Sequence, residues 1–313
     1  PHPQRRAARR PDNAKTMETP ERVLRRLEFK IVRRLDGFLF GDYRGVFYGP
    51  SLDLAEVREY QPGDEVRRID WNVTARMSRI FVRQYLEERE LTAWLAVDLS
   101  PSMRFGTRRQ LKRDTATEFS AVAAYIVTRH GDKAGLIGFP GRHVFIPPRG
   151  GRTQALRVIH TLDSLAEPER SVADLGESLR MIAKTVRRRS LLFVVSDFQA
   201  KDGWEQPLRE LVRRHEVIAV WVTDPAEREL PDVGGLFVRD PETGEQVWVD
   251  TSDRRLRETY RNLVTAQEQK IRRAFRHAMV DTLELSTAEP LVGPLLRFIS
   301  RRKRRGRWNL AGR

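Results

Sequence analysis

Continuous runs of apolar residues, each of strand length, recur between helix-like segments over the last two thirds of the chain. Examples are Leu95–Val97, Leu191–Val195 and Val217–Val222. A strand with one face in water alternates apolar and polar residues, whereas a continuous apolar run predicts a strand buried on both faces. Helices must then cover both faces of the sheet. The pattern therefore predicts an α/β fold with a doubly wound, mainly parallel sheet flanked by helices.

Strands and helices alternate regularly from residue 91 onward. Helical periodicity predicts helices over residues 110–130, 153–165, 175–186, 204–214, 252–277 and 290–300. Apolar runs predict strands over residues 80–86, 92–97, 134–139, 143–146, 191–195, 217–222 and 282–285. Two further runs, 236–239 and 246–249, flank the turn sequence Pro-Glu-Thr-Gly-Glu and predict a β-hairpin.

The chain divides into four parts by composition. Residues 1–19 lack an apolar pattern and predict a basic, disordered tail. Residues 20–90 form an N-terminal extension, which begins with an amphipathic helix from Pro20 and continues as a turn-rich and β-like stretch. Residues 91–300 hold the regular strands and helices and form the main domain. Residues 301–313 are a second basic tail.

The net charge of +15 is concentrated at the two ends of the chain. Residues 1–36 and 297–313 together supply 14 of these charges, so the central part is almost neutral. Solvated tails are the ordinary interpretation of such charge runs, and weak binding to nucleic acid or to an anionic membrane is the alternative. The balanced core and the lack of interleaved aromatic residues in the tails argue against specific nucleic-acid recognition.

Two of the predicted strands end in acidic, hydroxyl-rich loops. Asp98, Ser100 and Ser102 follow the first strand at alternate positions, so in an extended loop their side chains point the same way. Asp197 follows the strand 191–195 and adds a second carboxylate. Carboxylate and hydroxyl oxygens are ligands that suit Mg²⁺, Mn²⁺ or Ca²⁺ better than zinc. The spacing therefore predicts a divalent-metal site beyond the carboxyl ends of the strands.

Asp, Ser and Pro are also ordinary cap and turn residues where a strand passes into a helix. For the Asp98 loop alone, the two interpretations are about equally supported. The Ser196-Asp197 pair at the end of a second buried strand favours the metal site, because parallel strands bring such loops to one edge of the sheet.

Several classes of protein are excluded by what the sequence lacks. It has no cysteine, hence no disulfide or thiolate metal site. No apolar run approaches the roughly 18 residues that span a bilayer, and no apolar stretch follows the charged start, so we expect a cytoplasmic protein. Phosphate-binding glycine loops and the nucleophile elbow are absent. A phosphatase with an aspartyl nucleophile at Asp98 would need an acid two residues later, where this chain has Ser100.

The strand-end loops resemble the metal-ion-dependent adhesion site (MIDAS) of von Willebrand factor A domains, which have a Rossmann-like fold. A longer segment, Arg58–Arg76, reads REYQPGDEVRRIDWNVTAR and closely resembles the hallmark of a bacterial family known as domain of unknown function fifty-eight. Further similarities to that family include Ser196-Asp197-Phe198 and Asp240-Pro241-Glu242-Thr243-Gly244. The resemblance covers roughly residues 20–300.

The resemblance also implies a third metal-site loop that contains a threonine. The matching stretch here is Ser171-Val-Ala173-Asp174-Leu175, with Ala173 where the threonine is expected, so Ser171 or Asp174 would have to take its place. We therefore expect metal ligands at Asp98, Ser100, Ser102, Asp197 and Asp174, with Mg²⁺ (or Mn²⁺ or Ca²⁺) as the cofactor. Within the hallmark segment, we expect Trp71 to anchor the extension against the core. A surface that binds a partner is the alternative interpretation of this segment.

Together these features predict a non-enzymatic, metal-dependent protein-interaction module. A carboxylate from a protein partner would complete the coordination of the metal. The family resemblance implies that this partner is a MoxR-type AAA+ ATPase, acting in chaperone-like assembly or maturation of other proteins. The alternatives are an arginine-rich protein that binds nucleic acid or a membrane surface through its tails and, third, a Mg²⁺-dependent hydrolase.

Overall fold

The computed structural model describes residues 56–64, 66, 69–77, 79–84, 91–140, 144–165 and 174–311, with side chains in the last helix up to residue 304. The tail 1–19 and the helix expected from Pro20 lie outside these residues. Among the helices that are described, none is long and apolar enough to cross a membrane.

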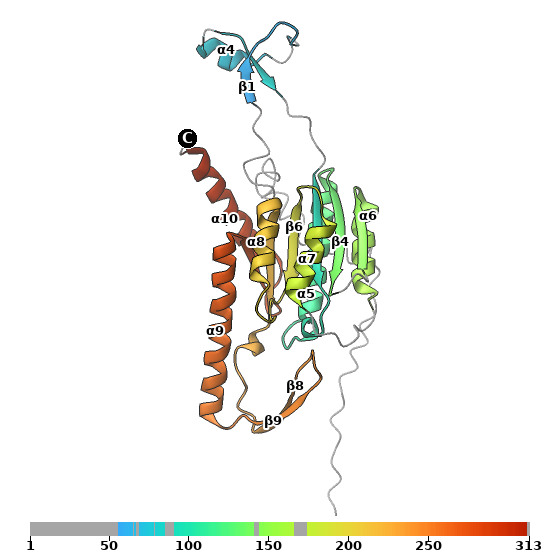
Figure 1. Ribbon diagram of the computed structural model, residues 1–313, viewed down its shortest axis with the longest axis vertical. Helices are drawn as coiled ribbons and strands as arrows, with labels where there is room; N and C mark the ends of the chain where they lie inside the picture. The colour runs from blue at the N-terminus through green and yellow to red at the C-terminus, as the bar shows by residue number, and fades with distance from the viewer. Residues whose placement is uncertain are drawn as a thin grey trace, which may run out of the picture.

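A six-stranded sheet forms the centre of the main domain (Figure 1). Its strands, in the order in which they lie side by side, are β10 (Asp281–Ser286), β7 (Glu216–Thr223), β6 (Leu191–Ser196), β3 (Thr92–Asp98), β4 (Lys133–Phe139) and β5 (Val144–Arg149). Every neighbouring pair is parallel except β4 and β5, which are antiparallel. The doubly wound, mainly parallel sheet predicted from the sequence is thereby confirmed.

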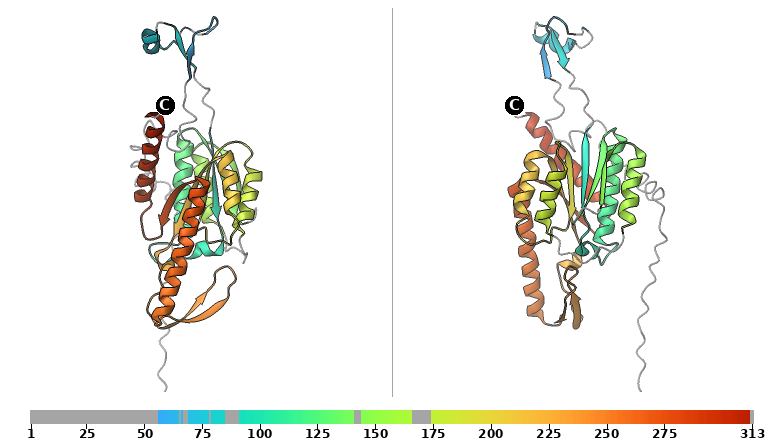
Figure 2. Two further views of the ribbon diagram at one scale, coloured as in Figure 1. Left: turned by 60° about the vertical axis from the view of Figure 1, so that its left-hand side comes forward. Right: turned by 45° about the vertical axis from the view of Figure 1, so that its right-hand side comes forward.

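Within the described residues, six helices cover the two faces of this sheet. Figure 2 shows helices on both faces. They are α5 (Lys112–Arg129), α6 (Arg152–Asp163), α7 (Leu175–Thr185), α8 (Glu205–Arg214), α9 (Arg254–Ala278) and α10 (Val292–Ala311). Residues of α5, α6 and α10 share one apolar core with one face of the sheet. Residues of α7, α8 and α9 share a second core with the other face.

Strand β3 shows why the apolar runs of the sequence are continuous. Leu95 and Val97 belong to the first core, whereas Trp94 and Ala96 belong to the second. Successive side chains of a strand point to opposite faces, so burial on both faces removes any polar alternation. The von Willebrand factor A-like fold expected from the sequence is confirmed by this two-core sheet with its single antiparallel edge strand.

The position of β3 determines where a ligand can reach the domain. Its two neighbours are β4 and β6, and the chain leaves β3 toward β4 before it returns to β6 on the other side. The order of the strands therefore reverses at β3. In open α/β sheets, ligands bind outside the carboxyl ends of the strands at such a point.

Two smaller β-ribbons stand outside the central sheet. Strands β8 (Gly235–Arg239) and β9 (Gln246–Asp250) pair only with each other and confirm the predicted hairpin. In Figure 1 this hairpin projects beyond the carboxyl ends of the central strands. The second ribbon pairs β1 (Glu56–Glu59) with β2 (Phe81–Gln84), and the short helix α4 (Trp71–Met77) lies between these two strands in the sequence.

Two expectations differ from the structure. Trp71 was expected to anchor the N-terminal extension against the core, but 66% of its surface is exposed and α4 has no buried residue. The last helix was expected to end near Ser300, but it continues to Ala311. Its residue Arg302 is only 8% exposed and forms ion pairs with Glu216 and Asp281, so this part of the basic end belongs to the folded domain.

Candidate functional site

The first site loop begins where β3 ends. Asp98 is the last residue of the strand, and the chain then forms a short 3-10 helix, η3 (Pro101–Arg104), that starts after Ser100. The amide of Leu99 donates a hydrogen bond to the carbonyl of Phe139 (2.6 Å), which ties the loop to β4. Gly138 permits this close approach, because a Cβ there would lie 2.5 Å from Leu99 Cδ1. The loop is therefore held in place by its neighbouring strand.

Asp98 is 6% exposed, and both of its carboxylate oxygens accept hydrogen bonds. The amide of Ser100 donates to Oδ1 (2.9 Å), and the hydroxyl of Ser196, at the end of β6, donates to Oδ2 (2.6 Å). Burial, together with the nearby charge of Asp197, raises the pKa of Asp98 to about 7, although the hydrogen bonds from Ser196 and Ser100 act to lower it. A positive charge placed beside Asp98 would therefore stabilise the ionised form of its carboxyl group.

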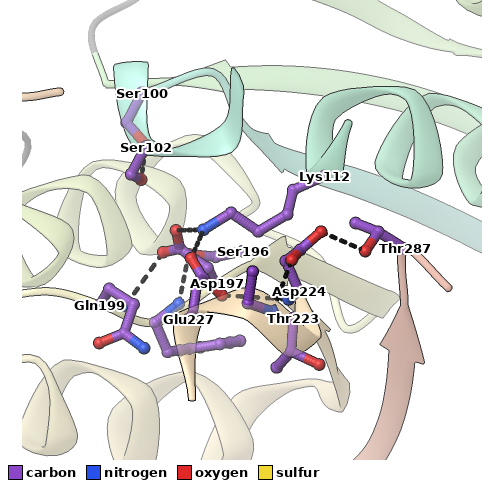
Figure 3. Close-up of polar contacts among 12 residues, drawn as sticks. Ser100, Ser102, Lys112, Ser196, Asp197, Gln199, Thr223, Asp224, Glu227 and Thr287 are labelled. Carbon is purple, nitrogen blue, oxygen red and sulfur yellow. Dashed lines mark hydrogen bonds and ion pairs between the residues drawn. The ribbon is translucent and has the colours of Figure 1, made fainter. Parts of the chain in front are cut away.

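The two serines predicted from the Asp98 loop lie together. Ser100 Oγ and Ser102 Oγ are 3.1 Å apart, and Ser100 is only 3% exposed. Figure 3 shows both side chains on the same side of the loop. The structure thus brings the two hydroxyls together in the loop that follows Asp98, as their alternate spacing predicted.

Asp197 follows β6 and is 3% exposed, but its charge is directed to a residue that the sequence analysis did not single out. Its Oδ2 lies 2.7 Å from the ammonium group of Lys112, the first residue of α5 (Figure 3). Its Oδ1 accepts a hydrogen bond from the amide of Gln199 (3.0 Å). The next residue, Phe198, has a positive φ of 53°, which is rare for a bulky side chain and turns the chain sharply after the site.

Lys112 is 1% exposed and binds two carboxylates. Besides Asp197, its Nζ lies 2.5 Å from Oε1 of Glu227, which follows β7. Burial alone would lower the pKa of Lys112, but the charges of Asp197 and Glu227 outweigh it and raise the pKa. The ammonium group therefore joins the ends of β6 and β7 to the start of α5.

Asp224 makes a second connection at the same edge of the sheet. Its carboxylate accepts hydrogen bonds from Thr107, in the loop before α5, and from Thr287, just after β10. Burial tends to raise the pKa of Asp224, but the hydrogen bonds from Thr287 and Thr107 lower it overall. One buried carboxylate thus connects three loops that are distant in sequence. Figure 3 shows its contact with Thr287.

Asp174, the fifth expected ligand, has another contact. It is the N-cap of α7, and its Oδ1 accepts a hydrogen bond from the amide of Glu177 (2.9 Å). Residues 171–173, which include Ser171 and Ala173, lie outside the described residues. The role of this third loop in a metal site stays a prediction.

The arrangement can be tested against the divalent metal that the fold family implies. Asp98, Asp197 and Glu227 bring three carboxyl groups to the same edge as the ammonium group of Lys112, and a pKa of about 7 leaves Asp98 only partly ionised near neutral pH. The donors near Asp98 are carboxylate and hydroxyl oxygens, which suit a hard cation. Within the described part of the chain, no three acidic or histidine side chains are grouped so as to hold a metal. A cation would therefore depend on Asp98 and the two serines, and these fit it in charge and chemistry.

Several residues of this edge escaped the sequence analysis as site residues. Lys112 looks like any surface lysine in the sequence, since nothing near it predicts burial. Glu227 lies in the motif Asp224-Pro-Ala-Glu227, which follows β7, and Glu242 lies in the motif Asp240-Pro-Glu242-Thr-Gly, which follows β8. Both motifs resemble motifs of the same family, but neither follows β3 or β6, the strands of the predicted metal site. Their occurrence just after predicted strands was the only available signal.

Comparison with known families gives one match that covers most of the chain. A family described as "Protein of unknown function DUF58" matches residues 56–270. An uncharacterized protein of Mycobacterium tuberculosis is 36% identical over 284 residues, which are 90% of this chain and 89% of the relative. An uncharacterized protein of Mycobacterium avium is 31% identical over 169 residues, 54% of this chain and 98% of the relative.

Among solved structures, two similar chains come from Bacteroides. An aerotolerance-related membrane protein of Bacteroides fragilis has a TM-score of 0.45 at 13% identity, over 67% of this chain and 99% of that one. The conserved hypothetical protein BatB of Bacteroides thetaiotaomicron has a TM-score of 0.43 at 16% identity, over 68% and 99%. The SpRpn10 VWA domain has a TM-score of 0.35 at 12% identity, over 66% and 94%.

Proposed function

Because the chain belongs to the DUF58 family and has a von Willebrand factor A-like fold, we propose that it is a protein-interaction module whose binding site is the Asp98 edge of the sheet. In this proposal, Asp98, Ser100 and Ser102 hold a divalent cation, with Mg²⁺ the first candidate. The cation supplies a positively charged attachment point, and a carboxylate from a protein partner binds to it.

The observation that carries the proposal is the buried carboxyl group of Asp98 beside Asp197, at an edge where the nearby ammonium of Lys112 pairs with other carboxylates. Asp98 and Asp197 are almost fully buried and close enough to raise the pKa of Asp98. Lys112 balances part of this charge, and its ammonium is engaged by Asp197 and Glu227. Buried charges that lack a counter-charge are costly, so binding of a cation beside Asp98 would be favourable.

A binding role is favoured over hydrolysis by the surroundings of Asp98. Both of its oxygens are engaged by Ser100 and Ser196, an arrangement that holds a carboxylate still rather than freeing it for attack. Ser100 stands where a phosphatase of this type would place its general acid. The buried ammonium of Lys112 is held by two carboxylates, so it remains protonated and is unsuited to act as a base.

The partner can be proposed only by chemistry and by the family resemblance. The chemistry calls for an exposed Asp or Glu that can enter the open coordination positions of the cation. The resemblance noted in the sequence suggests a MoxR-type AAA+ ATPase, in chaperone-like assembly or maturation of other proteins. We include that class of protein in the proposal as the first partner to test.

The metal is tested by thermal unfolding of the full chain with and without millimolar Mg²⁺ or Mn²⁺. A cation that binds only the folded state raises Tm; at 100 times its Kd the added stability is about 2.7 kcal/mol. Asp98→Asn removes the charge at constant size and should abolish the increment. Asp163→Ala, an exposed acid on α6, should leave it unchanged. Equal responses of the wild type and Asp98→Asn would exclude the metal site.

The partner is tested by capture of a purified MoxR-type ATPase on the immobilised full chain. The Ser100→Ala, Ser102→Ala double variant should fold normally but capture less ATPase, and EDTA should reduce capture by the wild type to the same level. Metal-dependent turnover of a general phosphatase or esterase substrate that is lost in Asp98→Asn would instead support the hydrolase.

A further inference from the structure

The segment that joins the Asp98 loop to helix α5 carries a cluster of arginines. Residues 104–113 read RFGTRRQLKR and begin at the end of η3. A surface hollow of about 680 Å³ is lined by four arginines of this segment, Arg104, Arg108, Arg109 and Arg113. Among the described residues that line the hollow, Asp114 is the only acid. The carboxyl edge of the sheet therefore has a positively charged surface beside its buried carboxylates.

Three of these arginines have no partner within the part of the chain that the structure describes. The side chains of Arg108, Arg109 and Arg113 form neither a hydrogen bond nor an ion pair there. Asp114, the acid beside them, is already engaged, because its Oδ2 accepts a hydrogen bond from the amide of Leu111 (3.3 Å). Positive charges that share one hollow repel one another, so an anion bound among them would be stabilised.

The backbone that presents the arginines is fixed by contacts of its own. The amide of Lys112 donates a hydrogen bond to the carbonyl of Phe105 (2.9 Å), which closes the loop. Gly106 permits this closure, because a Cβ there would lie 2.5 Å from a backbone oxygen on the other side of the loop. Thr107 binds Asp224 through its amide (2.8 Å) and its hydroxyl (2.7 Å). A surface that is ordered before binding loses less conformational entropy when a ligand binds.

The arginine loop is joined to the candidate site at both of its ends. At its start, the amide of Phe105 donates a hydrogen bond to the carbonyl of Ser102 (3.1 Å). At its end, the ammonium group of Lys112 contacts Asp197, as Figure 3 shows. A partner that binds to the arginines is thereby placed next to the loop that follows β3.

Apolar side chains indicate which kind of anion this surface fits. Phe105 is 40% and Leu111 36% exposed, and Leu111 lines the hollow together with the arginines. Arginine and aromatic residues are enriched where proteins bind each other. A single-stranded nucleic acid is instead held by a basic groove with aromatic rings on which its bases stack, and Leu111 offers no such ring. The combination favours a protein segment that carries both acidic and apolar residues.

We propose that Arg108, Arg109 and Arg113 form a docking surface for an acidic segment of the protein partner. Carboxylates of that segment pair with the guanidinium groups, each of which can bind a carboxylate through two parallel hydrogen bonds. Apolar side chains of the segment contact Leu111. The inference rests on the function proposed above, because the same segment supplies the carboxylate at the Asp98 edge, but pairing with the arginines needs no metal.

The test is a fluorescence-anisotropy titration of the full chain with a labelled peptide in which pairs of glutamates are separated by leucines. EDTA is present, so that no metal contributes. The double variant Arg108→Gln, Arg109→Gln removes two charges from the loop. The matched control, Arg187→Gln, Arg188→Gln, removes two charges from an exposed pair just before β6, at the amino edge of the sheet. Both variants keep the basic ends of the chain, so a difference between them reports the position of the arginines.

We expect the loop variant to bind the peptide about tenfold more weakly than the wild type, because two charge-assisted pairs are lost. The control variant should bind within about twofold of the wild type, since solvated charges far from the ligand contribute little. A peptide with serine in place of leucine should bind the wild type more weakly, because the contact with Leu111 is lost.

Equal affinities of the loop variant and the control variant would overturn the docking surface and leave the proposed function standing. A single-stranded oligonucleotide that binds the wild type more tightly than the peptide, and that depends on Arg108 and Arg109, would also overturn it and indicate a nucleic-acid site. A second titration replaces EDTA by Mg²⁺. If the loop variant loses the peptide while Mg²⁺ changes binding equally in the wild type and Asp98→Asn, the docking surface stands and the proposed metal site does not.

Discussion

Replacing Lys112 by methionine is expected to destabilise the domain strongly. Methionine keeps most of the length of the side chain, so the main change is the loss of the ammonium group that is 2.7 Å from Asp197 and 2.5 Å from Glu227. Lys112 is 1% and Asp197 3% exposed, so water cannot replace the lost charge. Removing one partner of a buried ion pair costs about 3–5 kcal/mol.

The cost can be measured by urea unfolding followed by circular dichroism. With an m-value of roughly 2–3 kcal/mol/M, a loss of about 4 kcal/mol lowers the midpoint by about 1.3–2 M at unchanged m. Because the change leaves Asp197 without its counter-charge, we expect the double variant Lys112→Met, Asp197→Asn to recover part of the stability. A matched control is Lys184→Met, a lysine in α7 that is outside the buried network.

The reasoning would be refuted by a Lys112→Met protein whose midpoint lies within about 0.4 M of the wild type, equivalent to about 1 kcal/mol. Additivity of the two single changes in the double variant would equally show that Lys112 and Asp197 do not interact. Either result would mean that Lys112 is not the charge that balances this edge of the sheet.

Two further predictions concern the fold and its basic end. His215 is 4% exposed, and burial together with the charges of Arg214 and Arg189 lowers its pKa below 6.5. Because the unfolded chain takes up the proton first, the contribution of His215 to stability should be full above pH 6.5. It should fall as the pH drops toward the folded-state pKa, by at most about 1.4 kcal/mol per pH unit. His215→Leu should flatten that dependence in urea titrations from pH 7.5 to 5, whereas the exposed His277→Leu should retain it. Deleting residues 1–19 and 305–313 should weaken heparin binding and reduce its salt dependence, whereas tight, salt-dependent binding by the shortened chain would support a nucleic-acid function of the core. The deletion stops at residue 304 because Arg302 pairs with Glu216 and Asp281.

Much of the fold could be predicted because its causes are local and periodic. The apolar run Leu191–Val195 is continuous because helices cover both faces of β6, and that signal survives without any knowledge of its neighbours. The hairpin was predictable for a similar reason, since its strands are adjacent in sequence and its turn contains Gly244. Trp71 shows the limit of such reasoning: a large aromatic residue suggests an anchor, yet its burial depends on a surface that lies elsewhere in the chain, and it is exposed.

The candidate site likewise has a part that the sequence predicted and a part that depends on distant residues. The sequence by itself determined Asp98, Ser100 and Ser102, because three alternate residues after one strand need only that strand to be placed together. It also indicated that Asp197 would reach the same edge, because parallel strands share their carboxyl ends. Only the tertiary structure decided that Lys112 balances Asp197 and that Glu242 lies on the Ser102 loop. Those contacts join residues that are 85 and 140 positions apart in the sequence. They depend on how α5 packs and on the path of the hairpin. Neither leaves a periodic signal in the sequence, so these contacts could not be predicted from it.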